Sequence, residues 1–272
     1  MLNLLLVFIV GVIEGITEWL PISSTGHMIL FDEFFPLGFR EEFYELFLVV
    51  IQLGAIMAVV LIYFNKLFPF SFKKGDSFIK KDIFSLWIKI IVSCFPAAII
   101  GVLFEDTFDA LFYNSRSVAL ALIIFGILFI LVELFNKKIP KINSISEIGI
   151  NTAVLIGVFQ VLAAVFPGVS RSGATILGAL LIGVSRTVAA EYTFYLAVPV
   201  MAGASLLKLL KFGFDFTGME FVYLLLGMVT AFVVSIIAIK FLIGYVKKHD
   251  FKVFGVYRII LGLLVLLLLK NS

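Results

Sequence analysis

The stretch Gly11-Val-Ile-Glu-Gly-Ile-Thr-Glu-Trp-Leu-Pro-Ile-Ser-Ser-Thr-Gly-His27 decides the fold, because it interrupts an apolar run with a dense group of polar residues. Glu14 and Glu18 are four residues apart, so their carboxylates share one face of a helix. Pro21 breaks that helix, and hydroxyl-bearing residues follow it. An ionisable group at membrane depth costs several kcal/mol unless it is paired or hydrated. This stretch is therefore the first candidate for a functional site.

The composition indicates an integral membrane protein. Of the 272 residues, 62% are hydrophobic and 14% are charged, and the mean hydropathy is +1.18. A soluble domain carries about a quarter charged residues, and a helical membrane span needs about 20 apolar residues. The net charge is only +3, so the pI near 8.9 reflects lysine-rich loops and not a nucleic-acid-binding surface. The single cysteine, Cys94, excludes an internal disulfide.

Apolar segments alternate with loops of contrasting charge. The segments cover about 2–20, 43–64, 84–104, 117–135, 147–166, 189–207, 220–243 and 253–269. Loops 65–83, 136–146 and 244–252 are basic, and the positive-inside rule predicts that they are cytoplasmic. Their lysines are Lys66, Lys73, Lys74, Lys80, Lys81, Lys137, Lys138, Lys141, Lys247, Lys248 and Lys252. The acidic loops 32–42 and 105–116 alternate with them and are expected outside.

Counting the crossings predicts two re-entrant hairpins. Segment 147–186 must begin and end on the cytoplasmic side, which puts its tip near Pro167–Ser172. Segment 1–31 is expected to enter from outside, with its tip near Pro21–Thr25. Irregular backbone at membrane depth is tolerated where it is buried in protein or lines a hydrated cavity. We therefore predict an all-α polytopic membrane protein, a single domain over 1–272, with six transmembrane helices plus two re-entrant helical hairpins.

The two hairpins are also related in sequence. A shift of 146 residues lays Gly11-Val12 on Gly157-Val158, Pro21 on Pro167, Ser24 on Ser170 and Glu45 on Glu191. Each repeat then contributes one hairpin and three spans, an odd number, so the halves have opposite orientation. The sequence thus predicts inverted repeats over approximately 1–140 and 147–272.

The second polar island, Pro167-Gly-Val-Ser-Arg-Ser-Gly-Ala-Thr175, has the same design as the first. Each island places Pro or Gly just before a short helix whose first turn is rich in hydroxyls. Helix N-termini offer free N–H groups and a positive dipole end, which favour phosphate. Arg171 would add a planar charged fork matched to phosphate oxygens. We expect the two islands to meet and form one anion-binding site.

The remaining ionisable residues suggest phosphoryl chemistry. Glu14 and Glu18 repel an anion, so they fit only if a divalent cation bridges them to a diphosphate, or if one acts as a base. Ser24 and His27 are the two candidate nucleophiles, and the sequence does not exclude direct attack by water. Arg258 and Glu133 lie near span ends and are predicted to be interfacial, whereas Glu45 and Glu191 are predicted to support the hairpins.

Both islands resemble the undecaprenyl-diphosphatase family, also called the bacitracin-resistance type. The matching motifs are Glu14-Gly-Ile-Thr-Glu-Trp-Leu-Pro-Ile-Ser-Ser-Thr-Gly-His27 and Pro167-Gly-Val-Ser-Arg-Ser-Gly-Ala-Thr175. The segments around Gln52 and Tyr195–Pro199 are also similar to the family, so the resemblance covers nearly the whole chain. It implies hydrolysis of undecaprenyl diphosphate to the monophosphate, which recycles the lipid carrier for peptidoglycan synthesis and confers bacitracin resistance.

The resemblance also implies a site and a setting. The residues it assigns are Glu18, Ser24, His27 and Arg171 for catalysis, Glu14 and Glu18 for a divalent cation (Mg²⁺ or Ca²⁺), and Ser23, Thr25, Gly168, Ser170, Ser172 and Thr175 for substrate binding. The expected partners are a polyprenyl diphosphate and membrane lipids but no nucleic acid, with a homodimer left open. The expected setting is the bacterial inner (cytoplasmic) membrane, with the active site facing outward.

The alternative function is transport. Paired broken helices in inverted repeats are common in transporters, so the chain could instead move an anion or flip a lipid phosphate across the membrane. Architecture alone favours that hypothesis. The motifs and the group of acidic and basic residues favour the hydrolase.

Overall fold

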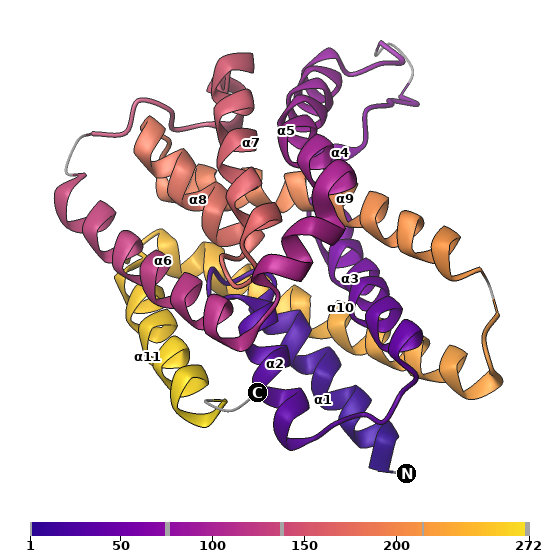
Figure 1. Ribbon diagram of the computed structural model, residues 1–272. Helices are drawn as coiled ribbons and strands as arrows, with labels where there is room; N and C mark the ends of the chain where they lie inside the picture. The colour runs from indigo at the N-terminus through magenta and orange to yellow at the C-terminus, as the bar shows by residue number, and fades with distance from the viewer. Residues whose placement is uncertain (1, 74–76, 137–138, 214, 270–272) are drawn as a thin grey trace.

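The computed structural model describes residues 2–73, 77–136, 139–213 and 215–269, and these ranges are almost entirely helical (Figure 1). The helices are α1 (Leu2–Thr17), α2 (Ser24–Phe34), α3 (Glu41–Ile62), α4 (Phe64–Leu67), α5 (Lys81–Phe112), α6 (Ser115–Phe135), the 3₁₀ turn η1 (Ile145–Glu147), α7 (Ile150–Val165), α8 (Arg171–Ile182), α9 (Arg186–Phe212), α10 (Gly218–Val246) and α11 (Lys252–Leu268). The described ranges hold isolated β-bridges but no strand. The predicted all-α class is confirmed. Lys74, Lys137 and Lys138, which contribute to the predicted sidedness, lie outside the described residues.

In the described part of the chain, five helices are long and apolar enough to cross a membrane. They are α3, α5 over Lys81–Phe104, α6, α9 and α10. Helices α1, α7 and α8 are apolar but shorter, with 16, 16 and 12 residues. These three belong to the segments predicted to form hairpins. The chain is therefore an integral membrane protein, and the count of six spans stays a prediction.

Each polar island is a turn between two short helices. Helix α1 ends at Thr17 and α7 at Val165, a few residues before the prolines of the islands, because a residue that precedes proline is disfavoured in helical conformation. Ser23 and Ser170 then cap α2 and α8 with unusual positive φ angles of 73° and 70°. The predicted shift of 146 laid Ser24 on Ser170. Ser23 and Ser170 have the same role, since each caps the helix after its turn. The alignment of the two repeats therefore shifts by one residue at the turn.

The ends of the second hairpin lie next to each other. Ile142 and Val184 form a parallel β-bridge, in which the Ser185 N–H donates to the Ile142 carbonyl at 2.9 Å. In Figure 1, α7 and α1 approach the middle of the molecule from opposite ends. At the first hairpin, Leu37 beyond α2 packs in one buried cluster with Leu6 and Val10 of α1. Residues on either side of each turn are thus in contact, and the re-entrant course of the two segments stays a prediction.

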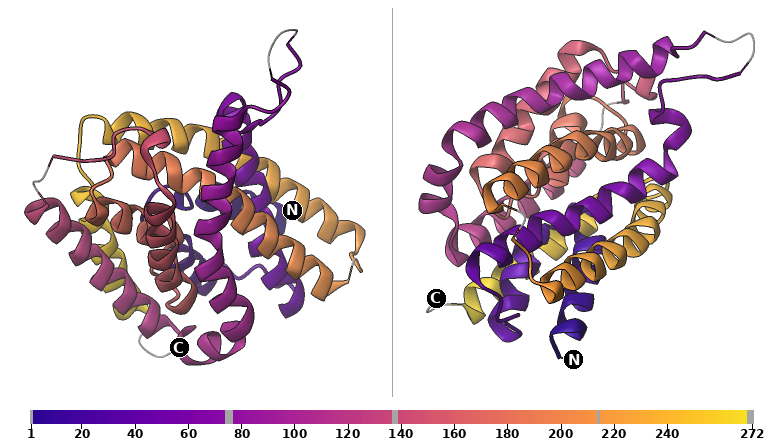
Figure 2. Two further views of the ribbon diagram at one scale, coloured as in Figure 1. Left: turned by 90° about the horizontal axis from the view of Figure 1, so that it is seen from above. Right: turned by 90° about the vertical axis from the view of Figure 1, so that its right-hand side faces the viewer.

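Close helix pairs hold the hairpins in place, as the views of Figure 2 also show. Helix α1 packs on α10, α7 on α5, and α6 on α11, while α3 packs on both α9 and α10. Glycines allow these approaches. A Cβ at Gly54 would lie 2.0 Å from the Met228 carbonyl oxygen, and one at Gly157 would lie 2.3 Å from that of Ser93. Small residues at such contacts let helix backbones approach closely in a membrane protein.

Helices α3 and α9 are linked by an ion pair at each end. Lys208 Nζ lies 2.7 Å from Glu45 Oε2, and Lys66 Nζ, just beyond α3, lies 2.7 Å from Glu191 Oε1. Tyr195 also donates a hydrogen bond to Glu191. Glu45 and Glu191 therefore connect α3 to α9, and the expectation that they also support the hairpins stays a prediction.

Two further predictions about the helix ends are corrected. The acidic loop expected over 105–116 is helical as far as Phe112, because that stretch contains neither Gly nor Pro and its phenylalanines pack along one face, Phe104 on Phe108 and Phe108 on Phe112. Glu133, predicted to be interfacial, has a side chain only 4% exposed. Its carboxylate accepts hydrogen bonds from Arg186 and from the Phe251 N–H at the start of α11.

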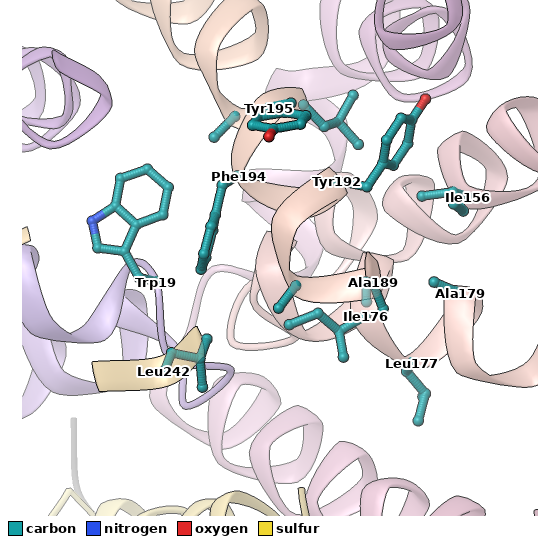
Figure 3. Close-up of a cluster of buried hydrophobic side chains, with 14 of the residues drawn as sticks. Trp19, Ile156, Ile176, Leu177, Ala179, Ala189, Tyr192, Phe194, Tyr195 and Leu242 are labelled. Carbon is teal, nitrogen blue, oxygen red and sulfur yellow. The ribbon is translucent and has the colours of Figure 1, made fainter. Parts of the chain in front are cut away.

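The largest buried cluster lies between the two turns and α9. Trp19, in the first turn, meets Phe194 of α9 edge to face, with ring centroids 5.3 Å apart (Figure 3). Tyr192 and Tyr195 extend the cluster along α9 towards Ile156 of α7. The apolar core is thus directly beside the polar turns.

Candidate active site

The two islands meet through Glu18, Ser24 and Arg171. Arg171 Nη2 lies 2.8 Å from Glu18 Oε1, and the Ser24 hydroxyl donates to Glu18 Oε2 at 3.1 Å. Glu18 and Arg171 are 153 residues apart in sequence, and their side chains are 7% and 12% exposed. Burial strengthens this ion pair because little water screens it. The expectation from the sequence that the two polar stretches meet is therefore confirmed.

Arg171 is oriented by α9 as well as by Glu18. Its Nη1 donates to the Thr193 carbonyl at 2.8 Å, and its guanidinium lies 6.0 Å from the centroid of the Trp19 ring. The Thr193 hydroxyl is 2.9 Å from Thr175 Oγ1, which also donates to the Arg171 carbonyl. The buried Arg171 Nε has no hydrogen-bond partner. An unpaired buried donor is costly, so Nε is suited to an anionic ligand.

The serine caps shape both turns. Ser23 Oγ accepts from the Gly26 N–H at 3.4 Å, and Ser170 Oγ accepts from the Gly173 N–H at 3.2 Å. The other amides of a helical first turn have no partner within their own helix. Arg171 begins α8, and Ser24, which begins α2, bonds the carboxylate that pairs with Arg171. Both helix N-termini, which favour anions, therefore begin at the Glu18–Arg171 pair.

The remaining residues of the predicted binding set differ in their surroundings. Ser172 is buried and its hydroxyl is 3.0 Å from that of Ser170, while Thr25 is half-buried in the first turn of α2. Gly168 adopts a φ of 92°, and a Cβ there would lie 2.7 Å from the Val118 carbonyl oxygen. Gly168 thus forms the turn and packs on α6.

His27 is turned towards α11. Its Nδ1 lies 2.7 Å from the Ser23 carbonyl oxygen, and its Nε2 lies 2.7 Å from the Tyr257 hydroxyl. A carbonyl oxygen can only accept, so the hydrogen-bond network assigns the proton of the neutral ring to Nδ1. The Tyr257 hydroxyl then donates to Nε2. Tyr257, which also stacks on His27, carries no signal in the sequence beyond its place in an apolar segment.

Glu14 is the residue best suited to a cation. It is buried, and its Oε1 has no hydrogen-bond partner, whereas both oxygens of Glu18 are engaged. Among the described residues, no group of three or more His, Cys, Asp or Glu side chains is arranged to hold a metal. Mg²⁺ often binds through one or two carboxylates together with substrate phosphates, and Glu14 meets that requirement. The buried Gln160 Oε1 also lacks a partner, and Gln160 stands 146 residues after Glu14.

Arg258 is a site residue that the sequence analysis missed. It is fully buried, so the prediction of an interfacial position is wrong. Its Nη1 donates to the Pro21 carbonyl at 3.2 Å, and its Nη2 donates to those of Gly168 and Val169 at 2.9 Å each. An arginine inside an apolar span is already a signal of function, and that signal could have identified it.

Comparison with known proteins identifies the family of the chain. The family model described as "Bacitracin resistance protein BacA" matches residues 7–264. The chain is 65% identical over 260 residues to the undecaprenyl-diphosphatase of Desulfitobacterium hafniense, covering 95% of this chain and 93% of the relative. It is 65% identical over 266 residues to undecaprenyl-diphosphatase 1 of Clostridium acetobutylicum (97% of each chain) and 60% identical over 269 residues to that of Enterococcus faecalis (98% and 97%). With such a match along almost its whole length, the chain belongs to the bacitracin resistance protein BacA family.

Proposed function

We propose that this membrane protein hydrolyses undecaprenyl diphosphate to undecaprenyl phosphate and inorganic phosphate. The observation that carries the proposal is the junction of Glu18, Ser24 and Arg171 from the two turns. The names of the relatives describe the same activity. The reaction recycles the lipid carrier for cell-wall synthesis in the bacterial membrane, and removal of the diphosphate form accounts for bacitracin resistance.

In the proposed mechanism, Arg171 and the N-termini of α2 and α8 bind the diphosphate. Glu18 accepts the proton of the Ser24 hydroxyl, and Ser24 Oγ attacks the terminal phosphorus. The bridging P–O bond breaks and undecaprenyl phosphate leaves. Water then hydrolyses the phosphoserine, releasing inorganic phosphate and restoring Ser24. When bound, a divalent cation held by Glu14 would neutralise charge on the diphosphate.

Ser24 is the better nucleophile of the two candidates because of its partner. Its hydroxyl is hydrogen-bonded to a carboxylate that can take the proton. Both nitrogens of His27 are engaged, one by the Ser23 carbonyl and one by Tyr257. His27 is therefore placed beside the reaction, where proton transfer with the phosphate would require one ring nitrogen to exchange its present partner.

The proposed architecture has six transmembrane helices plus two re-entrant helical hairpins in inverted repeats over approximately 1–140 and 147–272. The β-bridge between Ile142 and Val184 supports the second hairpin, because it joins the two ends of the segment. The packing of α1 on α10 and of α7 on α5 supports the repeat, since in each case the first helix of one half packs on a long helix of the other half. The site is proposed to face the outer side of the cytoplasmic membrane.

The test is phosphate release from a C55 polyprenyl diphosphate by purified protein in detergent, with and without EDTA. Release is expected from the parent chain, and we expect Glu18→Gln and Arg171→Ala to abolish it. Glu45→Gln is the matched control, because Glu45 also forms an ion pair but at the end of α3. If the folded parent protein releases no phosphate, the transporter hypothesis replaces the hydrolase. Phosphate release that persists in EDTA would show that the reaction does not need a divalent cation.

A further inference from the structure

We propose that Arg258 is a positioning residue that holds the two turns in register, so that Arg171 of one turn meets Glu18 and Ser24 of the other. The inference rests on the proposed function and adds a residue to it. Arg258 does not touch the reacting groups through a hydrogen bond of its own. It acts through the backbone that carries them.

Arg258 binds backbone carbonyls of both turns. One guanidinium nitrogen donates to the carbonyl of Pro21, in the first turn, and the other donates to Gly168 and Val169, in the second. Irregular backbone at membrane depth has carbonyls that need donors. A single side chain supplies them for both turns. The two turns are therefore fixed relative to one another as well as within themselves.

Arg258 lies close to glycines of neighbouring helices. A Cβ at Gly173, in the first turn of α8, would lie 3.1 Å from Arg258 Nη1. Helix α11, which carries Arg258, packs closely on α6. A Cβ at either Gly126 or Gly255 would lie 2.7 Å from the other's carbonyl oxygen. Arg258 is thus supported by a closely packed helix pair and fits against the start of α8.

Arginine is the side chain best suited to this position. The hydrogen bonds of Arg258 go to backbone carbonyls and not to a carboxylate, although its side chain is fully buried. Burying a charged group is costly, and a smaller neutral donor could satisfy one turn at less cost. Only the planar fork of arginine presents separated nitrogens in a fixed geometry. Its function is therefore to bridge two places at once.

A shift between the turns should affect the chemical step more than binding. Ser24 and Arg171 begin different helices, so their alignment depends on the relation of the turns. A displacement of about 1 Å between reacting groups costs about 100-fold in rate. Each turn retains its own helix N-terminus for phosphate, so the KM changes little.

The experiment compares Arg258→Lys and Arg258→Met with the parent protein, using kcat, KM and thermal unfolding. Arg40→Met is the matched control. Arg40 also makes three hydrogen bonds, to Asp215 and Glu220, but it lies before α3 and away from the turns. We expect both Arg258 variants to lose about 100-fold in kcat and to keep KM within about threefold. Arg40→Met is expected to retain kcat.

A double-mutant cycle separates positioning from a general loss of stability. If Arg258 acts by aligning Arg171, then the milder change Arg171→Lys should reduce kcat less in the Arg258→Met background than in the parent protein. The proposal is overturned if Arg258→Lys has parental kcat, because charge and not the fork would then suffice. It is also overturned if kcat falls only with the folded fraction, or if both Arg258 variants fail to fold. A parent protein without activity would instead refute the proposed function.

Discussion

Ser24 and His27 lie one turn apart on α2, yet their partners give them different roles. Ser24 contacts the carboxylate of Glu18, while His27 is held between the Ser23 carbonyl and Tyr257. The sequence alone left both residues open as nucleophiles. The hydrogen-bond geometry favours Ser24 because only that side chain has a base beside it.

We predict that Ser24→Ala lowers kcat on the order of 1000-fold or more, as removal of a nucleophile does in other enzymes. His27→Gln should cost less, about 100-fold, the contribution of a general acid or base. The measurement is steady-state phosphate release together with trapping of a phosphorylated intermediate. Trapping a phosphohistidine, or equal activity of Ser24→Ala and the parent protein, would contradict the assignment.

Tyr257→Phe gives a second residue-level prediction. The variant removes one hydrogen bond to His27 Nε2 and keeps the stacked ring. A neutral hydrogen bond contributes about 1 kcal/mol, so kcat should fall about fivefold. Tyr223→Phe, which alters a tyrosine that stacks on Phe39, is the control and should leave kcat unchanged. A loss as large as that of Ser24→Ala would show that Tyr257 takes part in the chemistry itself.

The junction of Glu18, Ser24 and Arg171 could be predicted from the sequence, because polar residues at membrane depth must find one another. Arg258 carries a weaker signal in the sequence, and Thr193 carries none. Arg258 stands near the start of an apolar segment, where an interfacial position is the ordinary interpretation. Thr193 accepts a hydrogen bond from Arg171 through its backbone carbonyl. Every residue has such a carbonyl, so the residue type does not indicate this role.

At the scale of the helices, close contacts through glycine are the clearest source of stability. Gly54 of α3 faces Met228 of α10, where a Cβ would lie 2.0 Å from a backbone oxygen. Gly203 of α9 has open space around its Cβ position. These two positions make a matched pair on transmembrane helices.

Gly54→Ala should lower the free energy of unfolding by about 1–3 kcal/mol, the usual cost of overpacking, because backbone cannot move aside as a flexible side chain can. Gly203→Ala should be neutral or slightly stabilising, since alanine favours helix. Thermal unfolding of both variants in the same detergent is the measurement. Equal unfolding temperatures would mean that α3 and α10 are not packed as described.

The starts of α2 and α8 were predictable because Pro, Gly and hydroxyl residues mark a new helix. The end of α5 was not, since acidic residues in 105–116 suggested a loop although nothing there prevents helix. The equivalence of the turns was misjudged by one residue. Identity of residue type aligned Ser24 with Ser170, whereas backbone conformation aligns Ser23 with Ser170.

At the scale of the whole molecule, the proposed topology makes opposite predictions for different loops. Single cysteines would be introduced into a Cys94→Ala background and labelled with an impermeant thiol reagent in intact cells. Gly38→Cys should be labelled because loop 32–42 is expected outside. Thr217→Cys should be labelled because α10 ends at the basic, cytoplasmic loop 244–252 and therefore begins outside. Ser146→Cys and Thr187→Cys should both be protected until the membrane is opened. Labelling of only one of that last pair from outside would exclude a re-entrant hairpin over 147–186.

The all-α membrane class and most of the spans could be predicted from the sequence. The length of the apolar segments indicates the spans, and the lysines of the loops indicate their direction. The helix partners could not, since pairs such as α3 with α9 depend on shape and on ion pairs between distant residues, including Lys66 with Glu191. In a chain that is 62% hydrophobic, apolar patterns do not distinguish a lipid-facing side from a packed one.

The charges of the site are divided between the two hairpins. The first brings Glu14, Glu18 and Ser24, and the second brings Arg171, with the neutral Gln160 at the position that corresponds to Glu14. Two copies of the first half would oppose four carboxylates and no guanidinium, and two copies of the second would have no general base. Neither half can therefore be exchanged for a duplicate of the other, and the covalent joining of unlike halves guarantees both carboxylates and a guanidinium in every molecule.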